Sequence, residues 1–157
     1  MGKNKGFTLM ELVIVVVILG FLAAVAIPKF SGIVNDSRIN AVKSEMQEIE
    51  IAIVGDAAVV SGGVSTHRGY FGDTGHMPAQ LMDLINKPAS DSTWDRSANN
   101  GIGSGWNGPY VRDDGTGAIF TDVWGNPYIL TATTLKSYGP NGTDDGGTGD
   151  DIVLNLQ

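Results

Sequence analysis

The chain has 157 residues, of which 42% are hydrophobic and 17% are charged, and this is the size and composition of one globular domain. It has no cysteine and only two histidines, His67 and His76, which excludes disulfide bonds, thiol catalysis and cysteine-ligated metal sites. Seventeen acidic and ten basic residues give a net charge of -7, and the scattered bases disfavour nucleic-acid binding.

The first predicted element is an apolar helix at residues 7–27, in which Glu11 is the only charged side chain. A helix of this length, at about 1.5 Å per residue, spans a hydrocarbon core of about 30 Å. Lys3 and Lys5 precede it, so the positive-inside rule keeps the N-terminus in the cytoplasm and sends the remainder outward. A secretory signal peptide cut after Ala26 is the alternative, but an export signal has no use for a carboxylate that is costly to insert.

The start of this helix carries a family resemblance. Residues 6–12, with the sequence GFTLMEL, and the apolar run after them resemble the N-terminus of a type IV pilin or pseudopilin. The resemblance implies that a prepilin peptidase removes residues 1–6 as a leader, cutting between Gly6 and Phe7, and methylates the new amino group of Phe7.

The resemblance also implies a role for Glu11 in assembly. A carboxylate in lipid is tolerated when it meets a partner charge, and the implied partner is the Phe7 amine of its own or a neighbouring subunit. Glu11 would then guide each new subunit into a growing filament. The alternative is a carboxylate that snorkels to the membrane surface without a protein partner.

An amphipathic continuation of the helix is predicted for residues 28–60. Pro28 removes one backbone donor and is expected to kink or locally melt the helix. Beyond it, apolar residues recur at spacings of three and four, which predicts one apolar stripe that the rest of the chain covers. The stripe consists of Ile39, Val42, Met46, Ile49 and Ile53. Gly62-Gly63 ends the helical pattern.

The globular part, residues 61–157, is predicted to be rich in turns, because 12 of the 22 glycines lie between residues 101 and 149. A short helix is expected at 79–86, followed by a surface loop at 87–107 that Trp94 and Trp106 anchor. We expect three strands in a small antiparallel sheet: residues 118–122, 128–133 and 135–138.

Two turn motifs sharpen the resemblance. GWNGPY at residues 105–110 and DVWGNPY at residues 122–128 are similar to patterns of the major pseudopilins of type II secretion. This resemblance implies an α+β, type IV pilin-like fold: a long N-terminal helix, half of it transmembrane, packed on a small C-terminal antiparallel sheet with a calcium-type loop. Trp106 and Trp124 are predicted to be packing residues, because tryptophan buries a large area with one donor to satisfy.

An acidic segment at residues 137–152 holds four aspartates, five glycines and no basic residue. A hard cation would relieve the repulsion, and Ca²⁺ accepts about six to eight oxygen ligands. The resemblance implies a structural Ca²⁺ held by the side chains of Asn141, Asp150 and Asp151 and the carbonyls of Tyr138 and Thr143. Asp144 and Asp145 are additional candidates, and Asn141 in place of the family's aspartate predicts weaker binding. A solvated acidic turn without metal is the alternative.

No catalytic constellation is predicted, because neither histidine lies in a recognisable nucleophile motif. The resemblance implies a structural subunit of a periplasmic pseudopilus, the piston of type II secretion, and not an enzyme. Its implied location is the bacterial inner membrane, crossed once, with residues 61–157 in the periplasm.

The implied partners are further copies in a filament, prepilin peptidase, an assembly ATPase, the inner-membrane assembly platform, minor pseudopilins and secreted proteins. Two alternatives stay open. One is a type IV pilin of a surface filament for adhesion, motility or DNA uptake, and the other is a membrane-tethered binding module that uses the 87–107 loop.

Overall fold

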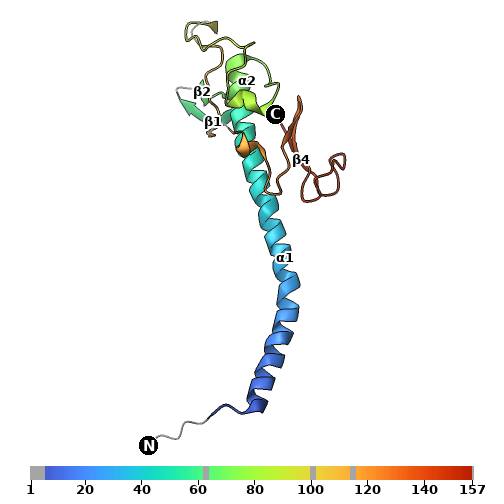
Figure 1. The fold of residues 1–157 in the computed structure, drawn as a ribbon. Helices are drawn as coiled ribbons and strands as arrows, with labels where there is room; N and C mark the ends of the chain where they lie inside the picture. The colour runs from blue at the N-terminus through green and yellow to red at the C-terminus, as the bar shows by residue number, and fades with distance from the viewer. Residues whose placement is uncertain (1–5, 62–63, 100–101, 114–115, 157) are drawn as a thin grey trace, which may run out of the picture. The chain divides into compact units, whose positions relative to one another are not determined.

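The computed structural model describes residues 6–61, 64–99, 102–113 and 116–156 (Figure 1). The chain forms two compact units, Met1–Arg38 and Ile39–Gln157, and each is described by itself. Most of the predicted leader, with Lys3 and Lys5, and the predicted Gly62-Gly63 stop lie outside the described residues.

Helix α1 runs from Leu9 to Val54. Its segment Leu9–Ala26 is long and apolar enough to cross a membrane, and none of it is buried within the chain. The helical assignment continues across Pro28, so the local melting that this proline allows is not present in the described residues of α1. Apolar side chains that the chain leaves exposed over this length need lipid or another protein to cover them.

Helix α1 ends at Val54, six residues before the end expected at residue 60, and Gly55 follows it. The Gly55 φ of +89° is left-handed, and a Cβ atom at this position would lie 2.3 Å from the carbonyl oxygen of His67. The predicted helix at 28–60 is therefore wrong beyond Val54. Residues Asp56–Ser61 form strand β1 instead, because glycine breaks the helix and the β-branched Val59 and Val60 favour an extended chain.

The core of the second unit confirms the predicted apolar stripe. Its buried members on α1 are Val42, Met46, Ile49 and Ile53, and Ile39 is partly exposed. The rest of the chain covers them with Tyr70, Leu81, Leu84, Phe120, Tyr128 and Leu135. Burial of each large apolar side chain contributes about 1.5–3 kcal/mol, so this cluster is the main source of stability.

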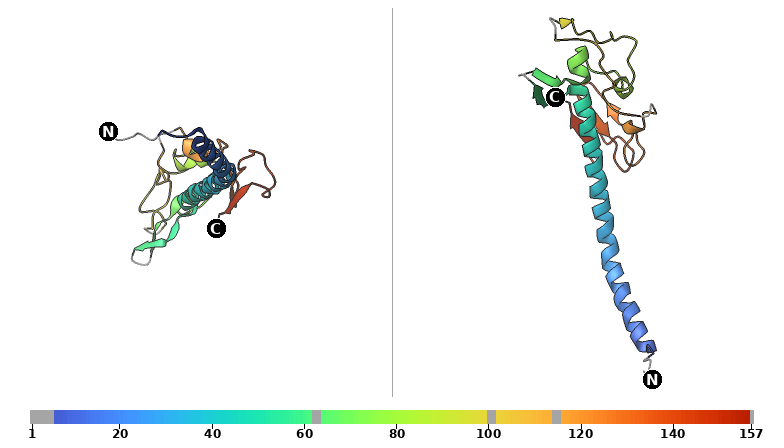
Figure 2. Two further views of the ribbon diagram at one scale, coloured as in Figure 1. Left: turned by 90° about the horizontal axis from the view of Figure 1, so that it is seen from below. Right: turned by 90° about the vertical axis from the view of Figure 1, so that its left-hand side faces the viewer.

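Two separate antiparallel sheets lie beside the C-terminal part of α1 (Figures 1 and 2). The first is a hairpin of β1 and β2 (Val64–His67), which was not predicted. The second has the order β3-β4-β5, where β3 is Ile129–Leu130, β4 is Thr134–Ser137 and β5 is Ile152–Asn155. It confirms the predicted α+β class and antiparallel C-terminal sheet, with shorter strands and with β5 added.

The remaining predicted elements are shorter or different. The helix expected at 79–86 is a 3-10 helix, η1 (Leu81–Leu84), and the strand expected at 118–122 is a 3-10 helix, η3 (Ala118–Phe120). Gly117 explains the second correction, because its left-handed φ of +75° turns the chain and its carbonyl accepts a hydrogen bond from the Phe120 amide at 3.0 Å, which closes a 3-10 turn where a strand was expected. Helix α2 (Gly69–Thr74) was not predicted.

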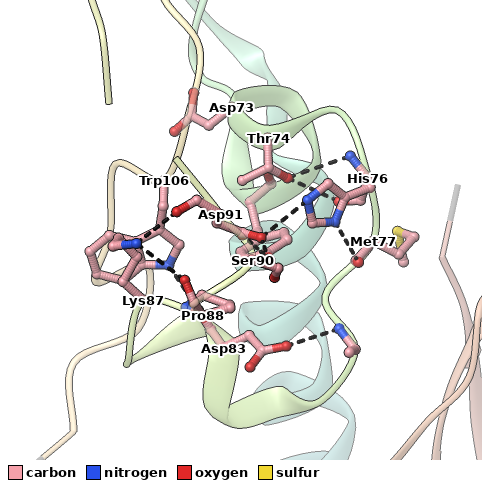
Figure 3. A network of polar contacts seen from close by, with 12 residues as sticks. Asp73, Thr74, His76, Met77, Asp83, Lys87, Pro88, Ser90, Asp91 and Trp106 are labelled. Atoms are coloured by element: carbon pink, nitrogen blue, oxygen red, sulfur yellow. Dashed lines mark hydrogen bonds and ion pairs between the residues drawn. The ribbon is translucent and has the colours of Figure 1, made fainter. Parts of the chain in front are cut away.

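Contacts of Asp91 fasten the start of the predicted loop at 87–107 to the rest of the second unit (Figure 3). The buried Asp91 carboxylate accepts a hydrogen bond from the Tyr70 hydroxyl and lies 3.4 Å from His76 Nε2, while Lys87 Nζ donates to the Asp91 carbonyl at 2.7 Å. Trp106 Nε1 donates to the Asp83 carbonyl at 2.9 Å and its ring packs against the core, which confirms its packing role. His76 is therefore part of a structural network.

Candidate assembly site and acidic loop

The predicted assembly residue Glu11 forms a capping box with Thr8 at the start of α1. The Glu11 amide donates to Thr8 Oγ1 at 3.2 Å, and the Thr8 amide donates back to Glu11 Oε2 at 3.1 Å. The Thr8 hydroxyl also donates to Oε2 at 3.0 Å. These bonds satisfy amides that have no partner within the helix, and they place a negative charge at the positive end of the helix dipole.

The capping box orients the Glu11 carboxylate and uses only one of its two oxygens. Among the described residues, all side-chain hydrogen bonds of Glu11 are made to Oε2, so Oε1 can accept from a further donor. Gly6 and Phe7 precede the helix, and Phe7 is 79% exposed. The predicted cleavage site therefore lies in a non-helical segment one turn before Glu11, which is the conformation that a peptidase can reach.

The predicted metal ligands lie in the acidic loop, residues 138–151, which joins β4 to β5 and is the red excursion beside β4 in Figure 1. Asn141 brings two aspartates together. Its amide Nδ2 donates to Asp150 Oδ1 at 2.6 Å and to Asp145 Oδ2 at 3.0 Å, and its backbone amide donates to Asp150 Oδ2 at 2.9 Å. Its Oδ1 accepts from the Thr143 amide at 2.6 Å.

Asp151 lies on the other side of the loop, and its side chain is fully buried. Its Oδ2 accepts from the amides of Asp145 and Gly147 at 3.1 and 2.7 Å, while Oδ1 is buried and has no hydrogen-bond partner among the described residues. A buried carboxylate oxygen without a partner costs free energy, which a cation at this position would recover.

Lys136 of β4 supplies positive charge to the same side of the loop. Its Nζ donates to Asp144 Oδ1 at 2.8 Å and lies 3.9 Å from Asp151 Oδ2. The hydrogen bond from Lys136, helped by the Gly146 amide, lowers the pKa of Asp144, and the same bond raises the pKa of Lys136. Both groups therefore stay charged at neutral pH.

The residues fit a hard cation in their chemistry, because the ligand atoms they offer are all oxygen, and one buried carboxylate oxygen has no partner in the part of the chain that the structure describes. Within the described part of the chain, however, no three His, Asp or Glu side chains are already arranged around a common point. Asn141 presents its Nδ2 to Asp145 and Asp150, so it acts as a donor here, and its Oδ1 would have to turn to become a ligand.

Comparison with known proteins identifies relatives of this chain. Residues 1–27 match the model of the prokaryotic N-terminal methylation motif. The type IV major fimbrial protein FimA of Dichelobacter nodosus is 35% identical over 63% of this chain and 59% of its own length. The type II secretion system core protein G of Escherichia coli (strain K12) is 28% identical over 96% of this chain and 90% of its own length.

The chain is a homologue of type IV pilins and pseudopilins. The type II secretion system core protein G of Pseudomonas aeruginosa is also similar, with 27% identity over 98% of this chain and 95% of its own length. For the fimbrial relatives the aligned region is less than two thirds of their length, from 59% for one FimA to 32% for another. No solved structure matches the chain significantly.

The architecture of this pilin homologue agrees with its relatives. Its long apolar helix followed by a small antiparallel sheet agrees with a type IV pilin-like fold, and the methylation motif with the apolar helix indicates a membrane-anchored chain. Pilins and pseudopilins are structural subunits, so the homology also supports the prediction that the chain is not an enzyme.

The sequence predictions missed two contributors to these sites. The capping partner Thr8 could have been found, because Thr-x-x-Glu before an apolar run is a known helix-start signature. Lys136 could not be assigned to the acidic loop from its position, because a strand residue can point to either face of a sheet and nothing local decides which.

Proposed function

We propose that this pilin homologue is a structural subunit of a type II secretion pseudopilus. The observation that carries the proposal is the extent of the alignments: the two core protein G relatives align with 96% and 98% of the chain, and the FimA relative aligns with 63%. The similarity to core protein G therefore includes the globular part as well as the helix.

Assembly follows from the first unit. Residues 7–27 would hold the subunit in the bacterial inner membrane, with residues 61–157 in the periplasm, until copies bundle through the same apolar surface. The exposed helix Leu9–Ala26 supports this role, because lipid and neighbouring helices are its two available covers. Glu11 would accept a hydrogen bond from the Phe7 amine of a neighbouring copy while Thr8 holds its carboxylate in place.

Maturation precedes assembly. Prepilin peptidase would cut between Gly6 and Phe7 and methylate Phe7, which creates the amine that Glu11 needs. An assembly ATPase and the inner-membrane platform would then add subunits, minor pseudopilins would start the filament, and its growth would push folded secreted proteins outward. The chain's own contribution is mechanical, through its surface and its helix.

Calcium binding at the acidic loop is the second part of the proposal. Asn141, Asp150 and Asp151 would hold Ca²⁺ with the carbonyls of Tyr138 and Thr143, and Asp144 or Asp145 would complete the set. The unpaired Asp151 Oδ1 supports this assignment. The ion would offset part of the negative charge of the loop and so hold the junction between β4 and β5.

Deletion of the gene in its own bacterium tests the secretion role. We expect secreted proteins to accumulate inside the cell and to return to the medium with the wild-type gene, while surface fibres stay unchanged. Loss of surface fibres with normal secretion would replace the proposal with a type IV pilin. Normal secretion and normal fibres would favour a tethered binding module.

A thermal melt of the full chain in detergent tests the calcium role. Calcium should raise the melting temperature relative to chelator, because a ligand that binds only the folded state stabilises it. Asp151→Asn should remove this response, whereas Asp36→Asn, on the exposed surface of α1, should retain it. An equal response in wild type and Asp151→Asn would contradict the assignment.

A further inference from the structure

Lys136 places a cation inside the acidic loop. Its side chain is only 18% exposed, and its Nζ lies 2.8 Å from Asp144 Oδ1 and 3.9 Å from the buried Asp151. The Tyr138 ring lies beneath it, with its centre 5.8 Å from Nζ. The ammonium is thus held by two carboxylates and an aromatic face, which all favour its charged form.

The other side of the loop also has a donor from the chain. Asn141 Nδ2 hydrogen-bonds to Asp145 and Asp150, so Lys136 and Asn141 together contact all four aspartates. Within the described residues, the one buried side-chain oxygen that lacks a partner is Asp151 Oδ1. The chain itself therefore supplies a donor to each of the four carboxylates, and one carboxylate oxygen of Asp151 is left without a donor.

The Lys136 ammonium and a bound divalent cation would compete for the same carboxylates. A divalent cation that binds Asp151 and Asp144 would lie a few Å from the Lys136 ammonium, and two like charges at that distance repel. Where Asp144 completes the ligand set, its Oδ1 becomes available to the ion only when Lys136 Nζ leaves it.

We propose that Lys136 is a tethered counter-cation that keeps the acidic loop folded without metal and lowers its affinity for divalent cations. This inference rests on the calcium binding proposed above. Calcium then displaces the ammonium from Asp144, so calcium adjusts the stability of the loop and is not required for its folding.

The test uses the full chain in detergent, titrated with calcium chloride by calorimetry and melted in chelator. Lys136→Met keeps most of the aliphatic stem and removes the charge. We expect it to bind calcium about tenfold more tightly than wild type, because the repulsion is gone, and to melt several degrees lower in chelator. Lys136→Arg keeps the charge, and Lys43→Met removes an equal charge from the exposed surface of α1; both should behave as wild type.

Each outcome decides the proposal. Equal calcium affinities in wild type and Lys136→Met would overturn the role of Lys136 and leave calcium binding intact. An absence of calcium binding in all four proteins would overturn the proposed calcium site as well. If Lys136→Met is unfolded in chelator, calcium should refold it, and a variant that stays unfolded at saturating calcium overturns the proposal.

Discussion

The two units keep their apolar side chains in opposite environments, although α1 contributes to both. In Leu9–Ala26 no part of the helix is buried by the chain, whereas Val42, Met46 and Ile49 on the same helix are almost completely buried. The first segment needs lipid or other copies as cover, and the second is covered by its own chain. Substitutions in the first unit should therefore change assembly, and those in the second should change stability.

Glu11 is expected to give the largest effect on assembly. Glu11→Gln preserves the capping box with Thr8 but removes the charge, and Glu11→Ala removes both. We expect both to abolish filaments, counted by electron microscopy, with leader cleavage unchanged. Thr8→Ala keeps the charge and should reduce filaments without abolishing them, since a lost N-cap costs about 1 kcal/mol. Normal filaments from Glu11→Gln would show that the charge is not needed.

Leu84→Ala should have the largest effect on stability. Leu84 is completely buried in the core of the second unit, and truncation of such a residue costs about 2–5 kcal/mol. Val16→Ala, on the exposed apolar part of α1, should leave the free energy of unfolding of the second unit unchanged. Urea denaturation of the full chain in detergent, followed by tryptophan fluorescence, measures both. A similar loss in the two variants would contradict the division between the units.

Gly55→Ala should destabilise the end of α1 by about 2 kcal/mol or more, because the left-handed conformation is strained for alanine and the new Cβ would overlap the backbone of His67. Gly125→Ala is the matched control. Gly125 has nearly the same φ, +92°, but no atom within 4 Å of the added Cβ, so only the strain of about 1 kcal/mol applies. Equal losses in the same urea experiment would mean that the contact with His67 relaxes freely.

The smallest expected effect is a pH dependence at Asp91. Burial opposes ionisation of this carboxyl, but hydrogen bonds from Tyr70 and Ser90 and the charges of His76 and Lys87 lower its pKa. The unfolded chain therefore binds the proton more readily, so the stabilisation is present above about pH 4 and is lost as the pH falls through the lowered pKa. Asp91→Asn should flatten this decline in urea midpoints between neutral pH and pH 3. An unchanged profile would show that Asp91 does not contribute to it.

Predictions from the sequence succeeded where the interacting groups are close along the chain. The apolar run after Phe7 and the stripe from Val42 to Ile53 are helical patterns, in which neighbours three and four residues apart share a face. The predictions of the strands were less accurate. β5 has only four residues, and its pairing with β4 depends on a loop that brings Ser137 opposite Ile152.

The local chemistry of the chain thus specified a membrane-length helix, its capping signature at Thr8 and Glu11, and an acidic loop near the C-terminus. Contacts between distant residues were decided by the tertiary structure. The Tyr128 hydroxyl donates to Glu45, which is 83 positions away, and Lys136 donates to Asp144 in the acidic loop. The physical reason is that backbone hydrogen bonding and helical periodicity act over a few residues, whereas charge pairing and core packing act through space. Residues far apart in the sequence come close enough for such contacts only when the chain has folded.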